Sequence, residues 1–150
     1  MIRAVRYMCI AALLLCACSR PDAYEEFRKA SAKENGSYCF MIDMSDTLCT
    51  YDLDLYTRID CSMQQFASMP DSIRMNMVYT SPSGRKYAEK FAAAKDSFSQ
   101  SSSFSKEYII PYRRDLVPVE HGIWNLCITV GNEDRFPDMR GIGIQVRWKR

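Results

Sequence analysis

Alternating apolar and polar positions along most of the chain predict β-strands. The clearest run is 51–60, in which every second residue shares one face: Tyr51, Leu53, Leu55, Thr57 and Ile59. A period of two is that of a strand, whereas a helix would scatter these side chains around its axis. The same period, or strand-forming composition after a turn, marks the segments 73–79, 85–91, 106–112, 124–130 and 142–148.

Turn residues and short connections predict how these strands assemble. The loop between 124–130 and 142–148 is too short for a crossover helix, so we expect these two strands to pair side by side in antiparallel fashion. The serine-rich segment 92–105 is weakly apolar, and we expect a mobile loop there. Because no amphipathic helix is evident, residues 37–150 are predicted to form an all-β domain, an antiparallel β-sandwich of about seven or eight strands.

The N-terminus has the pattern of an export signal. Arg3 and Arg6 precede an apolar stretch at 8–17 that is shorter than the roughly 20 residues needed to span a bilayer, which predicts a signal peptide at 1–17. The run Leu15-Cys16-Ala17-Cys18 resembles the bacterial lipobox, with Cys18 as the lipid acceptor and first mature residue. The alternative is an ordinary secretory signal cut after Ala17. The polar segment 18–36 is predicted to be a tether, with at most a short helix around 25–32.

Composition and charge argue against several classes of function. The chain has 150 residues, 47% of them hydrophobic and 25% charged, with a formal net charge of +2. The signal peptide contributes two arginines and no acid, so the mature chain is close to neutral and offers no electrostatic footprint for nucleic acid. The chain contains one histidine, His121, and its sequence context matches no catalytic triad. We expect no cofactor.

Three carboxylates share the polar face of the 51–60 strand. Asp52, Asp54 and Asp60 have the spacing of a calcium site or a glycosidase carboxylate pair, but a solvated strand face partly neutralised by Arg58 is the preferred interpretation. The oxygen-rich loop 131–138 lacks the ligand order of an EF-hand and is predicted to be a turn. We therefore expect no catalytic residues and no metal site.

Small and aromatic residues near the C-terminus have structural explanations. Gly141 and Gly143 precede no helix that would bind phosphate, so they are expected to permit close strand packing or a bulge. Trp124 and Trp148 are in register with apolar neighbours and are predicted to lie in the core. The remaining aromatic residues include nine tyrosines and seven phenylalanines, which would form a glycan-stacking platform only if several stood on one exposed face.

Four cysteines beyond Cys18 remain in the mature chain: Cys39, Cys49, Cys61 and Cys127. No C-x-x-C pair suggests zinc or redox chemistry. Cys49 and Cys61 flank one straight strand, about 40 Å apart, and cannot bond to each other. A hairpin at Ser45-Asp46 would place Cys39 opposite Cys49 and allow a disulfide, and four buried thiols are the alternative.

The C-terminal run Pro118-Val-Glu-His-Gly-Ile-Trp-Asn-Leu-Cys-Ile-Thr-Val, followed by Arg140-Gly-Ile-Gly-Ile-Gln-Val-Arg, resembles the gliding-motility lipoprotein H family of Bacteroidetes. Upstream, the segments 40–46 and 51–58 are similar to that family's Asp-x-x-x-x-Tyr-x-Leu-x-x-x-x-Arg block. The family's Gly-Arg-Trp-x-Gly segment is absent, and the serine-rich stretch 96–105 stands in its place. The resemblance implies an outer-membrane lipoprotein associated with gliding or secretion machinery, and it implies no catalytic residue.

These observations predict a lipid-anchored, non-enzymatic envelope lipoprotein of the outer membrane that docks on a partner protein. A glycan-binding accessory lipoprotein that uses an exposed sheet face is the alternative. Asp46-Thr47-Leu48 and Asp71-Ser72-Ile73 also match the Asp-Ser/Thr-apolar motif that Bacteroidetes O-glycosylate on exported proteins, with Asp96-Ser97-Phe98 as a weaker match. Thr47, Ser72 and Ser97 are therefore candidate O-glycosylation sites.

Overall fold

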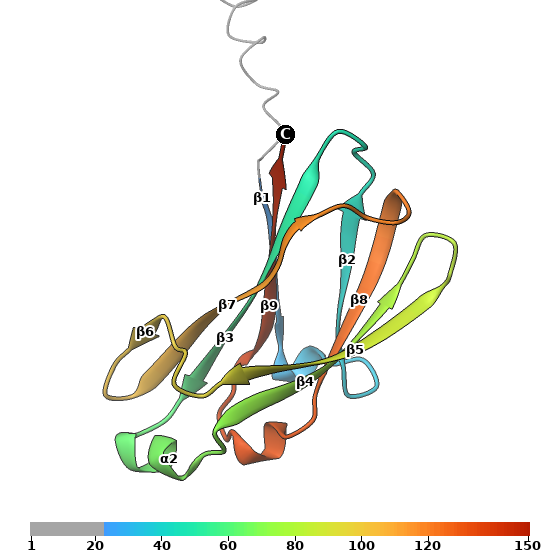
Figure 1. Ribbon diagram of the computed structural model, residues 1–150. Helices are drawn as coiled ribbons and strands as arrows, with labels where there is room; N and C mark the ends of the chain where they lie inside the picture. The colour runs from blue at the N-terminus through green and yellow to red at the C-terminus, as the bar shows by residue number, and fades with distance from the viewer. Residues whose placement is uncertain (1–22) are drawn as a thin grey trace, which may run out of the picture.

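The computed structural model describes residues 23–150, which form two facing antiparallel sheets (Figure 1). The five-stranded sheet has the order β1 (Ala23–Lys29), β9 (Gly141–Lys149), β3 (Thr50–Asp60), β7 (Ser105–Leu116) and β6 (Gln100–Ser101). The four-stranded sheet has the order β2 (Tyr38–Met44), β8 (Gly122–Val130), β4 (Ser72–Thr80) and β5 (Lys86–Ala94). The predicted all-β sandwich is confirmed.

The core lies between the two sheets and follows the predicted alternation. β3 contributes every second residue from Tyr51 to Ile59, and β4 contributes Ile73, Met75 and Met77, all of them fully buried. Burying these side chains supplies the main favourable term in folding, at about 25 cal/mol per Å² of apolar surface. Trp124 is 7% exposed within this core, and Trp148 packs against it from the edge.

The predicted tether is wrong for most of its length. Ala23–Lys29 is an edge strand that pairs with β9 from Ala23↔Arg147 to Lys29↔Gly141, and Ala30–Ala32 is a single turn of 3-10 helix, η1. No α-helix forms around 25–32. The segment looks polar because an edge strand buries little, and here only Tyr24, Glu26 and Arg28 turn toward the sandwich. The folded domain therefore begins at or before Ala23.

The predicted pairing of the last two strands is also wrong. β8 lies between β2 and β4, whereas β9 lies between β1 and β3 in the other sheet. The connection between them contains a short 3-10 helix, η2 (Glu133–Arg135), and needs to cover only the spacing of about 10 Å between packed sheets. A loop of that length serves either arrangement, so loop length alone does not decide the pairing.

The segment expected to be a mobile loop, 92–105, is largely tied down. β5 extends to Ala94, and β6 pairs with β7 through Gln100↔Glu107 and Ser101↔Lys106. Lys106 is 3% exposed; its ammonium group donates to Ser101 Oγ at 2.6 Å and lies 5.2 Å from the ring centroid of Phe66. Phe66 belongs to α2 (Met63–Ser68), which begins with a capping box.

The cysteine pairing differs from the predicted Cys39–Cys49 bond. Cys39 and Cys127 are register partners on β2 and β8 and form a disulfide, whereas Cys49 and Cys61 are buried free thiols at the two ends of β3. The expected hairpin at Ser45-Asp46 does not exist, because the chain there passes from one sheet to the other. That crossing carries Cys49 away from Cys39. Among residues 23–150, none of the helices is both long and apolar enough to span a bilayer.

Candidate functional site

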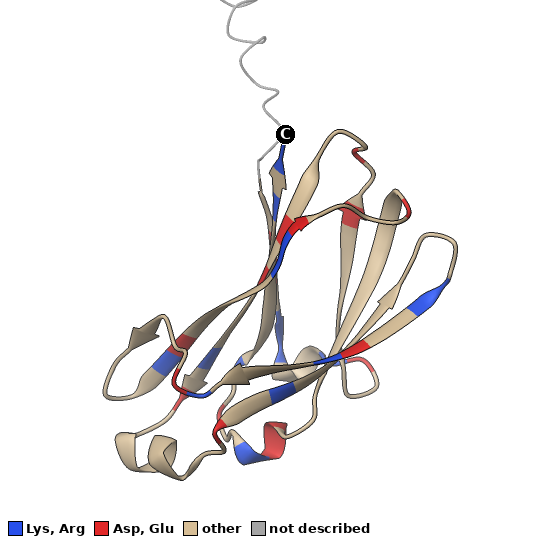
Figure 2. Ribbon diagram, in the orientation of Figure 1, with Lys and Arg blue, Asp and Glu red and all other residues tan. Residues whose placement is uncertain are grey.

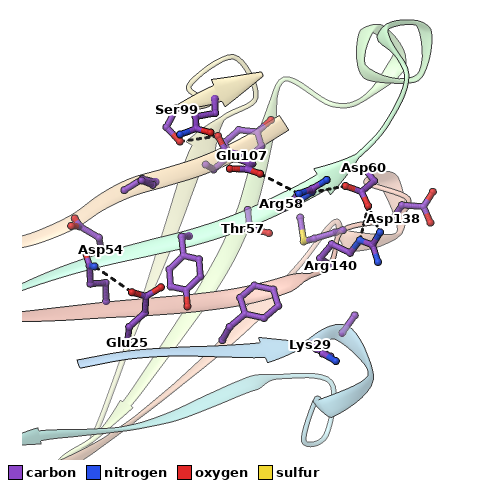
Figure 3. Close-up of a pocket in the computed structure, with 18 of the residues that line it drawn as sticks. Glu25, Lys29, Asp54, Thr57, Arg58, Asp60, Ser99, Glu107, Asp138 and Arg140 are labelled. Carbon is purple, nitrogen blue, oxygen red and sulfur yellow. Dashed lines mark hydrogen bonds and ion pairs between the residues drawn. The ribbon is translucent and has the colours of Figure 1, made fainter. Parts of the chain in front are cut away.

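A groove of about 1020 Å³ lies on the outer face of the five-stranded sheet (Figure 3). Its floor is formed by outward-facing residues of β1, β9, β3 and β7. Because register partners stand side by side across a sheet, these residues form three parallel rows. The middle row is apolar, and the two flanking rows are polar.

The middle row is Phe27, Gly143, Tyr56 and Ile109, successive register partners across four strands. Gly143 makes room for the Tyr56 ring, since a Cβ at this position would lie 2.1 Å from Tyr56 Cζ. The expected role of Gly143 in close packing is confirmed. Phe27 stacks on Tyr56 with ring centroids 5.7 Å apart and planes 28° apart. Phe27 is 38% exposed and Ile109 is 57% exposed, so the row presents apolar surface to solvent.

One flanking row is Glu25, Gln145 and Asp54, again register partners. The Gln145 side-chain amide donates to Glu25 Oε2 at 3.5 Å. Burial, together with the charge of the neighbouring Glu25 carboxylate and a hydrogen bond to it, raises the pKa of the Tyr56 hydroxyl. Asp54 is 3% exposed and forms ion pairs with Arg147 at 2.6 Å and Arg114 at 2.5 Å.

The other flank is a chain of ion pairs that ends the groove. Arg58 lies between Glu107, at 3.2 Å, and Asp60, at 2.7 Å, and Arg140 donates to the second oxygen of Asp60 at 2.6 Å (Figure 3). The hydrogen bond from Arg58, with a further one from Arg140, lowers the pKa of Asp60. Arg58, Arg140, Asp60 and Glu107 are therefore already paired with one another.

The three carboxylates of β3 do not all lie on a solvent-exposed strand face. Asp60 is partly exposed, but Asp52 and Asp54 are each 3% exposed, which corrects that expectation. Asp52 accepts a hydrogen bond from the Asp115 backbone N–H at 2.9 Å and pairs with Lys149 at 2.7 Å. The long cationic side chains of β9 and β7 cover the two carboxylates. Within residues 23–150, no three His, Cys, Asp or Glu side chains gather as a metal site.

The other sequence candidates lie apart from the groove. Thr47 is exposed between β2 and β3, Ser97 is exposed after β5, and Ser72 is half-buried as the first residue of β4. Thr47 and Ser72 therefore lie at opposite ends of the sandwich. His121 is exposed directly before β8. Cys18 lies outside the described residues.

The outer face of the four-stranded sheet is a second candidate surface. Exposed apolar side chains stand on three of its strands: Met41 on β2 at 63%, Ile123 on β8 at 53% and Val78 on β4 at 37%. The Cys39–Cys127 disulfide lies in the same face, with Val78 as the register partner of Cys127. Figure 2 shows β8 without charge along its length. Its charged neighbours on this face are three cations and one acid: Arg74, Lys86, Lys90 and Asp43.

Comparisons with known proteins add little. No family model matches the chain, and no curated protein matches it. A solved structure of the Tobacco streak virus coat protein dimer is similar over 89% of this chain and 90% of that chain, with 10% identity and a TM-score of 0.26. A likeness at this level supports no functional argument.

The groove was missed in the sequence because its floor is a row across strands. Phe27 lies in the segment predicted to be a tether, and Gly143, Tyr56 and Ile109 lie on three strands whose neighbours could not be assigned. The segment 24–29 gave no detectable strand signal, because each face of the strand combines one aromatic residue with charged ones.

Proposed function

We propose that this protein is a non-enzymatic, lipid-anchored lipoprotein of the outer membrane that docks on an envelope protein through the outer face of its four-stranded sheet. The observation that carries the proposal is the group of exposed apolar side chains Met41, Val78 and Ile123 on that face, beside the Cys39–Cys127 disulfide and the uncharged strand β8. Exposed apolar patches of this kind typically mark interaction surfaces. The resemblance to the gliding-motility lipoprotein H family stays a prediction, and it suggests gliding or secretion machinery as the partner.

Charge complementarity narrows the chemistry of the partner. Arg74, Lys86 and Lys90 lie on the β4 and β5 side of this face, and Asp43 is the acid on the β2 side. A partner surface with apolar side chains and an acidic group of residues at one side fits this face, since opposite potentials speed association and exclude wrong partners.

The proposed lipid anchor determines which end of the sandwich faces the membrane. Cys18 is five residues before Ala23, where β1 begins, and five residues reach at most about 18 Å. The end of the sandwich that carries Ala23 and the C-terminus would therefore lie at the membrane surface (Figure 1). Val117 and Val119, which are 64% and 77% exposed, lie in a loop at this same end and suit contact with lipid.

A non-catalytic role agrees with how the polar groups are used. The carboxylates of β3 are paired with Arg58, Arg114, Arg140, Arg147 and Lys149, so none is poised as a free acid or base. General acid–base catalysis needs a carboxyl group with a pKa near the working pH, whereas the pKa values of Asp52 and Asp60 are lowered.

The test compares matched surface variants in the native host. Wild type, Met41→Asp, Ile123→Asp and the control Ile109→Asp, which changes an equally exposed residue on the opposite sheet, are crosslinked in intact envelopes and purified. We expect one envelope protein to co-purify with wild type and Ile109→Asp and to be lost from the other two. Equal recovery with the wild type and all three variants contradicts docking through the four-stranded face.

A further inference from the structure

We propose that the groove on the five-stranded sheet binds a neutral glycan chain across the strands. This site is separate from the docking face, which lies on the opposite side of the sandwich, and neither proposal depends on the other. The inference is carried by three features of the groove: an apolar strip, hydrogen-bonding groups on both sides of it, and an excess of carboxylates over cations, with both arginines already paired.

The apolar strip matches the shape of a sugar chain. The row Phe27, Gly143, Tyr56 and Ile109 crosses four strands, a span of about 14 Å at the usual strand spacing. The tight fit at Gly143 holds the Tyr56 ring directly over the strand, and Phe27 adds a second ring in a near-parallel orientation. Aromatic side chains of this kind pack against the apolar faces of pyranose rings while polar groups beside them stay hydrated or bonded.

The flanking rows supply hydrogen-bond partners for hydroxyl groups. Glu25 and Gln145 border one side of the strip, and Glu107 and Gln100 border the other. Carboxylates accept hydrogen bonds, and amide side chains both donate and accept them, which is the set that sugar hydroxyls need. The Tyr56 hydroxyl is hydrogen-bonded to Glu25, and its oxygen can still accept a hydrogen bond within the strip.

The charges in the groove disfavour an anionic ligand. The lining contains five carboxylates, Glu25, Asp54, Asp60, Glu107 and Asp138, against three cations, Lys29, Arg58 and Arg140. Arg58 and Arg140 are both engaged with Asp60. An anion bound at either arginine would compete with Asp60, and the excess of carboxylates in the lining would repel it, so the groove favours an uncharged chain.

The backbone under the groove disfavours an extended peptide. A peptide that adds to a sheet uses the free N–H and C=O groups of an edge strand. The floor here is the face of β9 and β3, and each of these strands is paired on both sides, β9 with β1 and β3 and β3 with β9 and β7. The ligand must therefore be recognised by side chains alone, and a strip only one residue wide is too narrow for an apolar helix face.

The experiment measures binding of the detergent-solubilised lipoprotein by calorimetry to a panel of hexasaccharides. The neutral probes are cello-, malto-, manno-, xylo- and N-acetylchito-oligosaccharides, and oligogalacturonate is the anionic probe. We expect at least one neutral probe to bind, with no binding of oligogalacturonate. Phe27→Ala should weaken that binding about tenfold or more, because truncating an aromatic side chain in direct contact with a ligand commonly costs that much.

Matched variants separate binding from folding. Phe27 is part of an edge strand and is 38% exposed, so Phe27→Ala should keep a cooperative thermal transition. Ile109→Ala, at the far end of the strip, should also weaken binding, whereas Met41→Ala on the opposite sheet should leave it unchanged. Failure of every neutral probe to bind, preference for oligogalacturonate, or equal binding by folded Phe27→Ala would overturn the proposal.

Discussion

Cys39 of β2 and Cys127 of β8 are opposite each other in register and are joined by a disulfide across 88 residues of sequence. The bond links the edge strand of the four-stranded sheet to its neighbour, within the face proposed to dock. It therefore ties the N-terminal half of the domain to the C-terminal half and holds the register of Met41 next to Asn125.

Peptide mapping without reduction should recover one disulfide, between Cys39 and Cys127, together with free thiols at Cys49 and Cys61. The double variant Cys39→Ala/Cys127→Ala should lose on the order of 4 kcal/mol of unfolding free energy in the chain-entropy account of a loop this long. Urea unfolding measures the loss. A Cys39–Cys49 peptide, or equal stability of the double variant and wild type, would contradict the observed pairing.

Gly143→Ala should destabilise the protein by about 1–3 kcal/mol, since the added Cβ must displace the Tyr56 ring. Gly131→Ala is the matched control, because a Cβ there meets its nearest neighbour at an ordinary 3.8 Å. Thermal denaturation compares the two. In a Tyr56→Ala background the cost of Gly143→Ala should shrink, and an undiminished cost would show that the ring is not the cause.

Protonation of Asp52 should destabilise the folded protein at acidic pH. Its pKa is lowered from 3.8, first by the hydrogen bond from Lys149 and then by that from the Asp115 N–H. A carboxyl group with a lowered folded-state pKa stabilises the fold above its unfolded pKa, and this stability is lost as the pH falls through the folded value. Asp52→Asn should cost about 1–2 kcal/mol at neutral pH and flatten the decline below pH 4.

Urea unfolding at a series of pH values between 6 and 2 provides the comparison for Asp52→Asn. Asp134→Asn, which changes an exposed carboxylate in η2, is the control and should follow the wild-type curve. If the unfolding free energy falls more steeply with decreasing pH in Asp52→Asn than in the control, the assignment is contradicted.

O-glycosylation should favour Thr47 and Ser97 over Ser72. A bulky sugar needs an exposed hydroxyl, and Thr47 and Ser97 are exposed, whereas Ser72 is half-buried at the start of β4. The intact mass of protein from its native host should exceed polypeptide plus lipid, and Thr47→Ala should remove one increment. A mass equal to polypeptide plus lipid alone would exclude the modification.

The sequence predicted the inner face of each long strand well, because burial on one side of a strand imposes a period of two. The alternation in β3, β4, β8 and β9 placed Leu53, Met75, Leu126 and Ile144 in the core, where they lie. The same period carries no information on which strands are neighbours. The pairing of β8 with β9 and of Cys39 with Cys49 both failed for this reason.

Short edge strands, and sites formed by residues from several strands, could not be predicted from the sequence. β1 buries too little to show a clear apolar face, so its polar composition suggested a tether. The buried positions of Asp52 and Asp54 depend on Arg114, Arg147 and Lys149, which come from two other strands. The groove depends on register across four strands, and only the assembled sheet brings Phe27 to Tyr56.

The central claim, that this is a lipid-anchored envelope protein, is tested most directly at Cys18. Cells expressing wild type or Cys18→Ala are labelled with palmitate, and the purified protein is assayed for label and for membrane partitioning. The account predicts labelled, membrane-bound wild type and unlabelled, soluble Cys18→Ala, since stable attachment requires more than one acyl chain. Unchanged labelling and membrane partitioning of Cys18→Ala would contradict it.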